Sequence, residues 1–279
     1  MENRIKVAIQ GFEGCFHQTA AYALLGENIE IKGCSNFREL TQMVESGEAD
    51  KGVMAIENSI AGSILPNYAL LQNYSLKITG EIHMRIHQHL LAIKGTKIED
   101  IREVQSHPMA LLQCGDFLST LNNVRLLESR DTGYSAQVVS QEKDCTQAAI
   151  AGELAAELYG LEIIKKDIHS VENNYTRFLL IDREDTAKPV IGSNKASIYF
   201  KIAHERGSLT SVLKCFEKLN VNMTKLQSNP IPTDPFRYLF HTDMEFDHLE
   251  EFLSALDAAR KVTEELNICG IYKKGVFVE

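Results

Sequence analysis

A run of polar side chains from Asn173 to Arg177 stands directly before the apolar residues Phe178 to Ile181. The apolar run predicts a buried strand, so the polar residues are expected at its mouth. Two carboxamides, the Thr176 hydroxyl and the Arg177 guanidinium can together bind a small anion and donate a proton to it. We therefore expect a small-molecule site here, neutral to cationic in charge. The alternative is structural, with Arg177 in a surface ion pair and the asparagines in turns.

A second polar group, from Glu57 to Ser63, follows the apolar residues Met54 to Ile56. Ligands of open α/β sheets bind beyond the carboxyl ends of the strands, so this segment is a second candidate for a binding site. A helix cap formed by Ser59 or Ser63, with Glu57 in solvent, explains the segment equally well.

A glycine-containing loop from Gly11 to His17 lies between a predicted strand and a predicted helix. Free backbone N–H groups and the helix dipole at such a turn can hold a carboxylate or phosphate. A turn without a ligand is about equally expected, because neither the dinucleotide pattern nor the P-loop pattern is matched. Cys15 and His17 are a poor nucleophile and base pair, since side chains two residues apart do not face each other on a helix.

Other positions that could carry chemistry have structural explanations. Ser106-His107-Pro108 predicts a turn and a helix start rather than a catalytic histidine, and Asp131-Thr132 predicts a helix cap. The histidines that include His83, His87 and His89 show no metal-ligand spacing with an acidic neighbour. The sequence therefore predicts no metal site.

Length, charge and cysteine usage restrict the class of protein. The chain has 279 residues, and a prior of ~150 residues per domain suggests two units. A formal net charge of -9 disfavours a general nucleic-acid or acidic-membrane binder, because both need basic surfaces. The six cysteines include no C-x-x-C pair, which argues against a zinc site and a redox motif. No signal-like or membrane-spanning apolar run is evident, so we expect a cytoplasmic protein.

Strand and helix signals alternate up to Asp182, which predicts an α/β fold. Asn36 is expected to cap a helix, with Glu39 at the capping-box position and Gly47 at the helix end. The expected strands of this region are 5–9, 29–34, 51–56, 76–82, 87–93, 124–128, 148–151 and 162–167. The expected helices are 19–25, 37–47, 109–121, 131–142 and 153–159.

A polar stretch from Asp182 to Asn194, which includes Lys188-Pro189, predicts a linker. Apolar and polar residues then alternate from Ala196 to Ile202, which predicts a half-buried strand. The elements expected after it are a helix at 209–219, strands at 221–227 and 238–244, a helix at 249–256 and a strand at 267–272. This βαββαβ order predicts a small ferredoxin-like sandwich.

Taken in order, these segments resemble the prephenate dehydratase family over nearly the whole chain. The resemblance rests on Gly11 to Ala21, Met54 to Ser59 with Gly62-Ser63, Ser106-His107-Pro108 with Gln113-Cys114, Asp131-Thr132, and Asn173 to Phe178. It implies a two-lobed, periplasmic-binding-protein-like catalytic domain over 1–182, with lobes at 1–75 plus 170–182 and at 76–169. Residues 183–194 are then the linker, and residues 195–279 resemble the ferredoxin-like ACT regulatory domain of this family.

The resemblance implies conversion of prephenate to phenylpyruvate in phenylalanine biosynthesis, with no metal or redox cofactor. Thr176 is the implied proton donor. The implied substrate-binding residues are Gly14, Asn58, Ser59, Asn173 and Arg177, with Glu57 and Phe178 in supporting roles. Feedback inhibition by phenylalanine is expected between paired ACT domains of a homodimer or homotetramer. The implied effector residues are Gly207, Ser208, Leu209, Asn222, Gln227, Ser228 and Asn229.

The chain departs from the family pattern in two motifs. The usual Gly-Pro-x-Gly-Thr-Phe-Ser has Phe12, Cys15 and His17 in place of proline, threonine and serine, so a hydroxyl role at position 17 is not carried over. In place of the usual Glu-Ser-Arg-Pro, this chain has Gln227-Ser228-Asn229-Pro230, which lacks the carboxylate and the guanidinium. The identity of the effector and its affinity therefore stay open. Arogenate, with an amino group where prephenate has a ketone, is an alternative substrate. A non-catalytic, two-lobed small-molecule-binding regulator is the alternative from another class.

Overall fold

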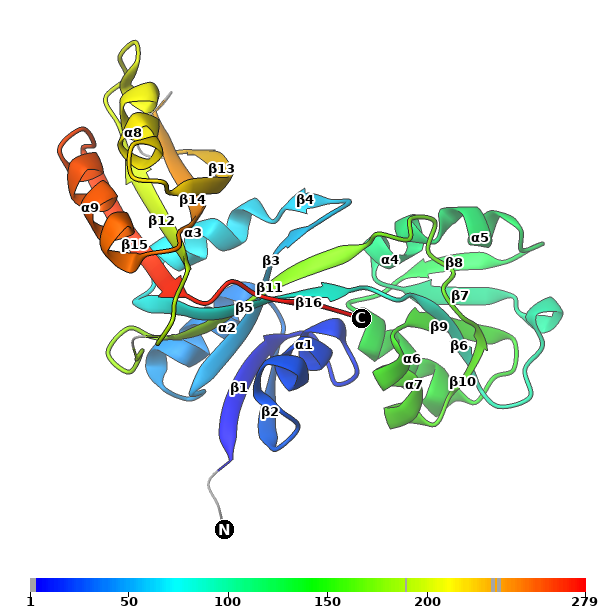
Figure 1. Ribbon diagram of the computed structural model, residues 1–279. Helices are drawn as coiled ribbons and strands as arrows, with labels where there is room; N and C mark the ends of the chain where they lie inside the picture. Colours follow the sequence, from blue (N-terminus) through cyan, green and yellow to red (C-terminus); the bar gives the residue numbers. More distant parts are fainter. Residues whose placement is uncertain (1–3, 189, 232–233, 235–236) are drawn as a thin grey trace. The chain divides into compact units, whose positions relative to one another are not determined.

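The computed structural model describes residues 4–188, 190–231, 234 and 237–279 (Figure 1). The described residues form two compact units, the first from the segments up to Ile64, Ile82–Phe178 and Phe277–Glu279, and the second from Leu65–Glu81 and Leu179–Val276. Pro189 of the predicted linker lies outside the described residues. No helix in the described part of the chain has the length and apolar content needed to cross a membrane.

The first unit carries most of a seven-stranded mixed sheet with the strand order β16-β5-β11-β3-β1-β2, in which β4 also pairs with β3. The elements around this sheet are β1 (Ile5–Gln10), α1 (Phe16–Leu25), β2 (Ile29–Cys34), α2 (Phe37–Ser46), β3 (Lys51–Asn58), β4 (Gly62–Ser63), β5 (Leu76–Arg85), β11 (Tyr175–Arg183) and β16 (Phe277–Val278). β1 is parallel to both β2 and β3. The carboxyl ends of these strands therefore meet at one edge of the sheet, which brings Gln10 and Asn58 to that edge.

Local sequence signals determine where the elements of this sheet begin and end. The Asn36 side chain accepts a hydrogen bond from the Glu39 N–H at 3.0 Å, and Gly47 ends α2 with φ of 79°, as predicted. β3 continues two residues beyond its predicted end, because Glu57 and Asn58 pair with Ser63 and Gly62 of β4. The hairpin replaces the alternative helix cap at this position.

A five-stranded sheet with the order β10-β6-β9-β7-β8 forms the rest of the first unit. Its elements are β6 (His89–Ala92), η1 (Ile98–Asp100), β7 (Glu103–Ser106), α4 (Pro108–Gln113), α5 (Gly115–Ser119), β8 (Arg125–Glu128), α6 (Thr132–Glu142), β9 (Gln147–Ala151), α7 (Glu153–Tyr159) and β10 (Glu162–Lys165). Leu90 and Ile150 face the core shared with α4 and α5, whereas Leu91 and Ala149 face the core shared with α6 and α7. Helices therefore cover both faces of this sheet (Figure 1).

Two elements of this region differ from the prediction. The single helix predicted over 109–121 is divided into α4 and α5, because Cys114 has φ of -103° and ψ of 14° between them. Strand β7 was not predicted, and Val104 is its one large aliphatic side chain, which is too weak an apolar signal to indicate a strand.

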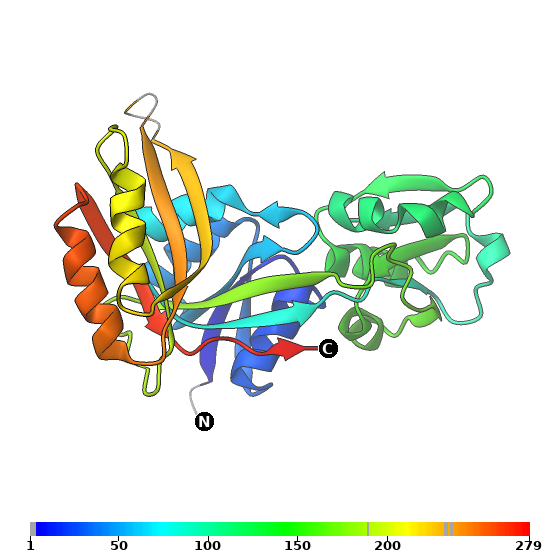
Figure 2. The ribbon, with the colours of Figure 1, turned by 45° about the horizontal axis from the view of Figure 1, so that its top comes forward.

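The second unit contains a four-stranded antiparallel sheet with the order β13-β14-β12-β15. Its elements are α3 (Leu65–Asn73), β12 (Lys195–Lys201), α8 (Ser208–Glu217), β13 (Asn222–Pro230), β14 (Tyr238–Glu245), α9 (Leu249–Arg260) and β15 (Glu265–Tyr272). From β12 to β15 the predicted βαββαβ order is present. Helices α8 and α9 lie side by side on one face of the sheet (Figure 2), where Phe200, Phe216 and Phe252 form the centre of the core.

The second face of this sheet is also covered, whereas the sequence predicted that β12 would be half-buried. Ser197, on the predicted polar face of β12, is only 7% exposed. The Tyr68 ring of α3 packs on the His241 ring with 4.9 Å between their centroids. A Cβ atom at position 270 would lie 2.1 Å from the Ile78 carbonyl oxygen, so glycine is needed for this close approach. Helix α3 and the start of β5 supply the cover that the local pattern could not reveal.

Candidate active site

A cavity of about 280 Å³ in the first unit collects side chains from both of its sheets. The residues that line it are Gln10, Cys15, Phe16, His17, Ala55, Asn58, Ala61, Ile64, Ile86, Gln88, His107, Met109, Ala110, Gln113, Asp131, Thr132, Thr176 and Phe178. The ends of β1 and β3, the start of β11 and the first residues of α1, α4 and α6 therefore converge here. Each motif segment of the first unit on which the resemblance rests contributes at least one side chain to this wall.

The strand period of β11 decides which of its polar residues reach the cavity. Successive side chains of a strand point to opposite faces, and Thr176 and Phe178 both line the cavity. Arg177 lies between them, is 5% exposed and does not line the cavity. The structure therefore separates Arg177 from the site in which the sequence placed it.

The Asn58 side chain holds the Thr176 hydroxyl in position. Asn58 Nδ2 donates to Thr176 Oγ1 at 3.0 Å, to Asn174 Oδ1 at 2.7 Å and to the Tyr175 carbonyl at 3.2 Å. Asn58 Oδ1 accepts the N–H groups of the β3–β4 turn, at 3.0 and 2.9 Å. Since Thr176 Oγ1 is an acceptor from Asn58 and donates to no described group, its own hydrogen can be donated into the cavity.

Asn174 contributes to the site, although the sequence favoured its neighbour Asn173. Asn174 is fully buried, accepts from Asn58, and donates through Nδ2 to Gln113 Oε1 at 3.0 Å. Asn173 is exposed and does not line the cavity. Counting back in steps of two from Phe178 and Thr176 reaches position 174, so the strand period contained the signal that identifies Asn174.

Ser59 supports the site from outside the cavity, and Glu57 also lies outside the cavity wall. Ser59 Oγ donates to the Asn173 carbonyl at 2.9 Å and accepts the Tyr175 N–H at 2.9 Å. These bonds join the β3–β4 turn to the segment that leads into β11. Neither Ser59 nor Glu57 lines the cavity, so Ser59 positions the loop, and Asn58 is the polar residue of the 57–59 segment that reaches the cavity wall.

Backbone N–H groups of the Gly11 to His17 loop donate to side chains of the protein itself. The predicted anion-binding site is therefore not formed at Gly14. The Phe12 N–H donates to Asp131 Oδ2 at 2.5 Å, and the Gly14 N–H donates to Gln18 Oε1 at 2.7 Å. Gly14 has φ of +82°, and a Cβ atom there would lie 3.0 Å from Ala155 Cα. Gly14 is thus required for a close turn rather than for contact with the cavity. The loop presents the start of α1 to the cavity instead.

His17 is an uncharged part of the cavity wall. Burial, followed by the nearby His107, lowers the pKa of His17 to about 3. Its Nε2 accepts the Ala55 N–H at 3.4 Å, and its ring meets Phe178 edge-on with 5.0 Å between centroids. A serine hydroxyl is thus replaced by a neutral imidazole at neutral pH.

The remaining ionisable side chains of the wall are a thiol, a carboxyl and a second imidazole. Burial and then Asp131 raise the pKa of the Cys15 thiol to about 12, so Cys15 is not an activated nucleophile. Asp131 caps α6 by accepting the Tyr134 N–H at 2.7 Å, and burial raises its pKa against the lowering effect of these backbone bonds. His107 accepts the Met109 N–H at 3.2 Å as the cap of α4, and burial lowers its pKa. No lysine or arginine of the described chain lines the cavity, so its wall is not cationic.

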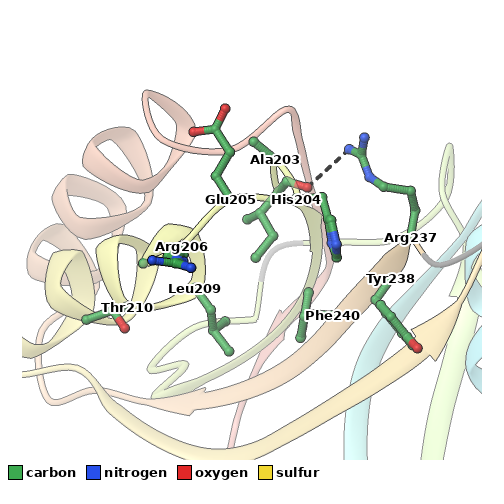
Figure 3. Close-up of a pocket in the computed structure, with 11 residues that line it drawn as sticks. Ala203, His204, Glu205, Arg206, Leu209, Thr210, Arg237, Tyr238 and Phe240 are labelled. Carbon is green, nitrogen blue, oxygen red and sulfur yellow. Dashed lines mark hydrogen bonds between the residues drawn. The ribbon is translucent and has the colours of Figure 1, made fainter.

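The second unit has a cavity of its own, of about 390 Å³, beside the start of α8. Figure 3 shows the Arg206 and Arg237 side chains on opposite sides of this cavity, with Leu209 and Phe240 between them. The Arg237 guanidinium donates to the Ile202 carbonyl at 3.1 Å.

Only part of the predicted effector set reaches this cavity. Gly207 and Leu209 line it, and Ser208 is the first residue of α8. The remaining predicted effector residues, Asn222, Gln227, Ser228 and Asn229, belong to β13 and do not line it. The sequence did not single out Arg206 or Arg237, because an isolated arginine carries no recognisable spacing.

Comparisons with known proteins identify a family for most of the chain. The family model described as prephenate dehydratase matches residues 7–186, so the match ends before β12. Arogenate dehydratase/prephenate dehydratase 2 of Arabidopsis thaliana, a chloroplastic protein, is 38% identical over 278 residues, which cover 91% of this chain and 71% of that protein.

Solved structures resemble nearly the whole chain. A protein described as GqqA, a novel type of quorum-quenching acylase, has a TM-score of 0.87 at 29% identity, with 97% of this chain and 98% of that chain covered. A prephenate dehydratase from Arthrobacter aurescens in complex with L-Phe has a TM-score of 0.86 at 24% identity, with 97% and 90% covered. The second likeness establishes a shared fold that extends through the four-stranded sheet.

Proposed function

The chain belongs to the prephenate dehydratase family, and we propose that it converts prephenate to phenylpyruvate, with arogenate as the alternative substrate. The observation that carries this proposal is the Thr176 hydroxyl, which lines the cavity and accepts a hydrogen bond from Asn58. The reaction breaks the bond between the ring and its carboxylate, and carbon dioxide leaves. The electron pair moves through the ring and expels the ring hydroxyl, which departs as water once it gains a proton.

Thr176 supplies that proton in the proposed mechanism. A threonine hydroxyl is a weak acid, so its position and the stabilisation of its oxygen decide whether it can act. The Asn58 Nδ2 donor at 3.0 Å stabilises the negative charge that develops on Oγ1 as the proton moves to the leaving hydroxyl. The buried Asn174, which donates to Gln113, keeps the Asn58 amide in this orientation. A proton from water then restores the Thr176 hydroxyl.

Neutral donors receive the substrate carboxylates in this proposal. Arg177 is on the opposite face of β11, so it supports the strand rather than pairing with the substrate. The amide side chains of Gln10, Gln88 and Gln113 line the cavity, as do Phe16 and His17 at the start of α1. The positive end of the α1 dipole and its first N–H groups favour an anion at this wall.

Residues 195–279 act as an ACT regulatory domain in this proposal, with phenylalanine as the effector. The cavity of the second unit offers Arg206 for a carboxylate, Glu205 for an amino group, and Leu209 and Phe240 for an aromatic side chain, whereas the Arg237 guanidinium of its wall pairs with Glu264. The L-Phe complex of the structurally similar Arthrobacter protein supports the choice of effector. The predicted residues on β13 belong to an edge strand, where pairing with a second copy would form the proposed homo-oligomer.

Product analysis tests the proposed reaction. The purified full chain is incubated with prephenate and, separately, with arogenate, and the formation of phenylpyruvate or phenylalanine is followed with and without added phenylalanine. We expect phenylpyruvate from prephenate and a lower rate with phenylalanine present. Absence of product from both substrates would overturn the enzymatic reading and leave a binding protein. Arg206→Ala tests the effector site, because loss of a carboxylate partner should weaken phenylalanine inhibition at least ~10-fold.

A further inference from the structure

Imidazole and carboxylate side chains gather on the reverse side of a segment that lines the catalytic cavity. Ile86 and Gln88 line that cavity, whereas His87 and His89 line a second cavity of about 420 Å³ in the same unit, which has only Phe16 in common with the first. The alternation follows from the extended backbone between β5 and β6. Asp167 also lines the second cavity, and it comes from the segment after β10. The cluster is therefore distinct from the Thr176 site.

Backbone pairing places the two segments in register. The Ile168 N–H donates to the Gln88 carbonyl at 2.9 Å, so His87 meets residues on either side of Ile168. His87 Nδ1 and Asp167 Oδ1 are 2.6 Å apart, and the His87 and His169 rings have 5.8 Å between their centroids. One potential ligand atom from each of His87, Asp167 and His169 lies within 4.8 Å of the others.

The surroundings of Asp167 hold its carboxylate towards His87. Asp167 has φ of +51°, in the left-handed region, and its N–H donates to Nδ1 of the buried His89 at 3.0 Å. His87 and Asp167 have side-chain exposures of 31% and 51%, so an ion can reach them from solvent. Nearby charges are balanced, because Arg85 pairs with Glu279 at 2.9 Å and Lys166 pairs with Glu153 at 3.6 Å.

We propose that His87, Asp167 and His169 bind one divalent ion of the zinc, cobalt and nickel class. Two imidazoles and one carboxylate suit these ions, whereas magnesium and calcium prefer sets of oxygen ligands. Ligand atoms at about 2.0–2.2 Å from one tetrahedral ion lie roughly 3.3–3.6 Å from each other, so His87 and Asp167 must move slightly apart from their present 2.6 Å and His169 must adjust to the same spacing. The ion replaces the His87–Asp167 hydrogen bond and the long 3.4 Å bond from the Gln88 N–H to His169 Nδ1. The bound ion joins residues 86–88, between β5 and β6, to residues 166–174, between β10 and β11. Both segments connect the two sheets of the first unit.

Metal titration of the untagged, chelator-treated full chain tests this site. Zinc is titrated by calorimetry, and cobalt binding is followed by its visible absorption. The wild type is expected to bind one zinc ion per chain and to gain thermal stability. His87→Gln and His169→Gln should each weaken binding by at least the roughly 10- to 100-fold that loss of an outer-sphere partner costs. His248→Gln is the matched control, because His248 is an exposed histidine before α9, in the second unit.

These outcomes distinguish a specific metal site from nonspecific metal binding. Unchanged zinc affinity in both His87→Gln and His169→Gln would overturn the proposal. It would also be overturned if the wild type at millimolar metal showed neither a heat of zinc binding nor the visible absorption of bound cobalt. Far-UV circular dichroism verifies that each variant is folded. If either histidine variant does not fold, Asp167→Asn, which keeps the side-chain shape, must show the same weakening for the proposal to stand.

Discussion

Replacing Thr176 by valine removes the cavity hydroxyl at nearly constant volume and leaves Asn58 its bonds to Asn174 and Tyr175. Loss of a general acid costs roughly 10²–10⁴-fold in turnover. We expect a loss of at least ~10²-fold, or about 2.7 kcal/mol of transition-state stabilisation. The change in KM should be modest, because the hydroxyl acts on the leaving group. Thr176→Ser should retain part of the activity, since it keeps the hydroxyl.

A double-mutant cycle with Asn58→Ala tests how the Thr176 hydroxyl is activated. A hydrogen bond to a charged group contributes about 1.5–3 kcal/mol, so losing the 3.0 Å bond from Asn58 to Oγ1 should lower kcat roughly 10- to 150-fold. If Asn58 acts through Thr176, the double variant should be within about threefold of Thr176→Val alone.

The assay is the initial rate of phenylpyruvate formation from prephenate, with urea denaturation used to verify folding of each variant. Ser59→Ala is the matched control, because Ser59 holds the same loop without lining the cavity, and it should retain most of the turnover. Near-normal turnover in a folded Thr176→Val variant would refute the assignment of the acid. Losses that multiply in the double variant would refute the proposed coupling.

Two further predictions concern stability. The pKa of His17 is lowered from 6.5 to about 3, so between these values the unfolded chain binds one more proton than the folded chain. The free energy of unfolding should therefore fall by about 1.4 kcal/mol per unit as pH drops from 6.5 towards 3. The His17→Phe variant should lack this contribution to the pH dependence of the free energy of unfolding. Urea denaturation that gives the same pH dependence for the wild type and the variant would contradict this. Lys195 and Glu81 form a buried ion pair of 2.8 Å, with side-chain exposures of 5% and 0%. Lys195→Met should lower the free energy of unfolding by about 3–5 kcal/mol, because the Glu81 carboxylate remains buried and loses its lysine counter-charge. Lys195→Met with Glu81→Gln should recover part of that loss in urea denaturation, and a double variant no more stable than the single would argue against it.

Local signals in the sequence determined most of the elements and the main members of the candidate site. The Asn36 cap and the Gly47 end of α2 depend on contacts between residues close in sequence, and both were predicted correctly. The βαββαβ order after residue 195 followed from apolar periodicity, which repeats within each element. Thr176 and Asn58 were identified because their motifs occur in order along the chain, and the cavity brings them within 3.0 Å of each other.

Only the tertiary structure decided which of the polar residues face the cavity and which distant segments meet. Arg177 and Asn173 have the expected types but lie outside the cavity, whereas the buried Asn174 completes the hydrogen bonds around Asn58. His87 and Asp167 are 80 residues apart, so no short-range spacing in the sequence predicts their contact. Periodicity and caps are properties of neighbouring residues, and therefore the sequence determines them directly. Contacts across the fold depend on the path of the whole chain, which the tertiary structure alone reveals.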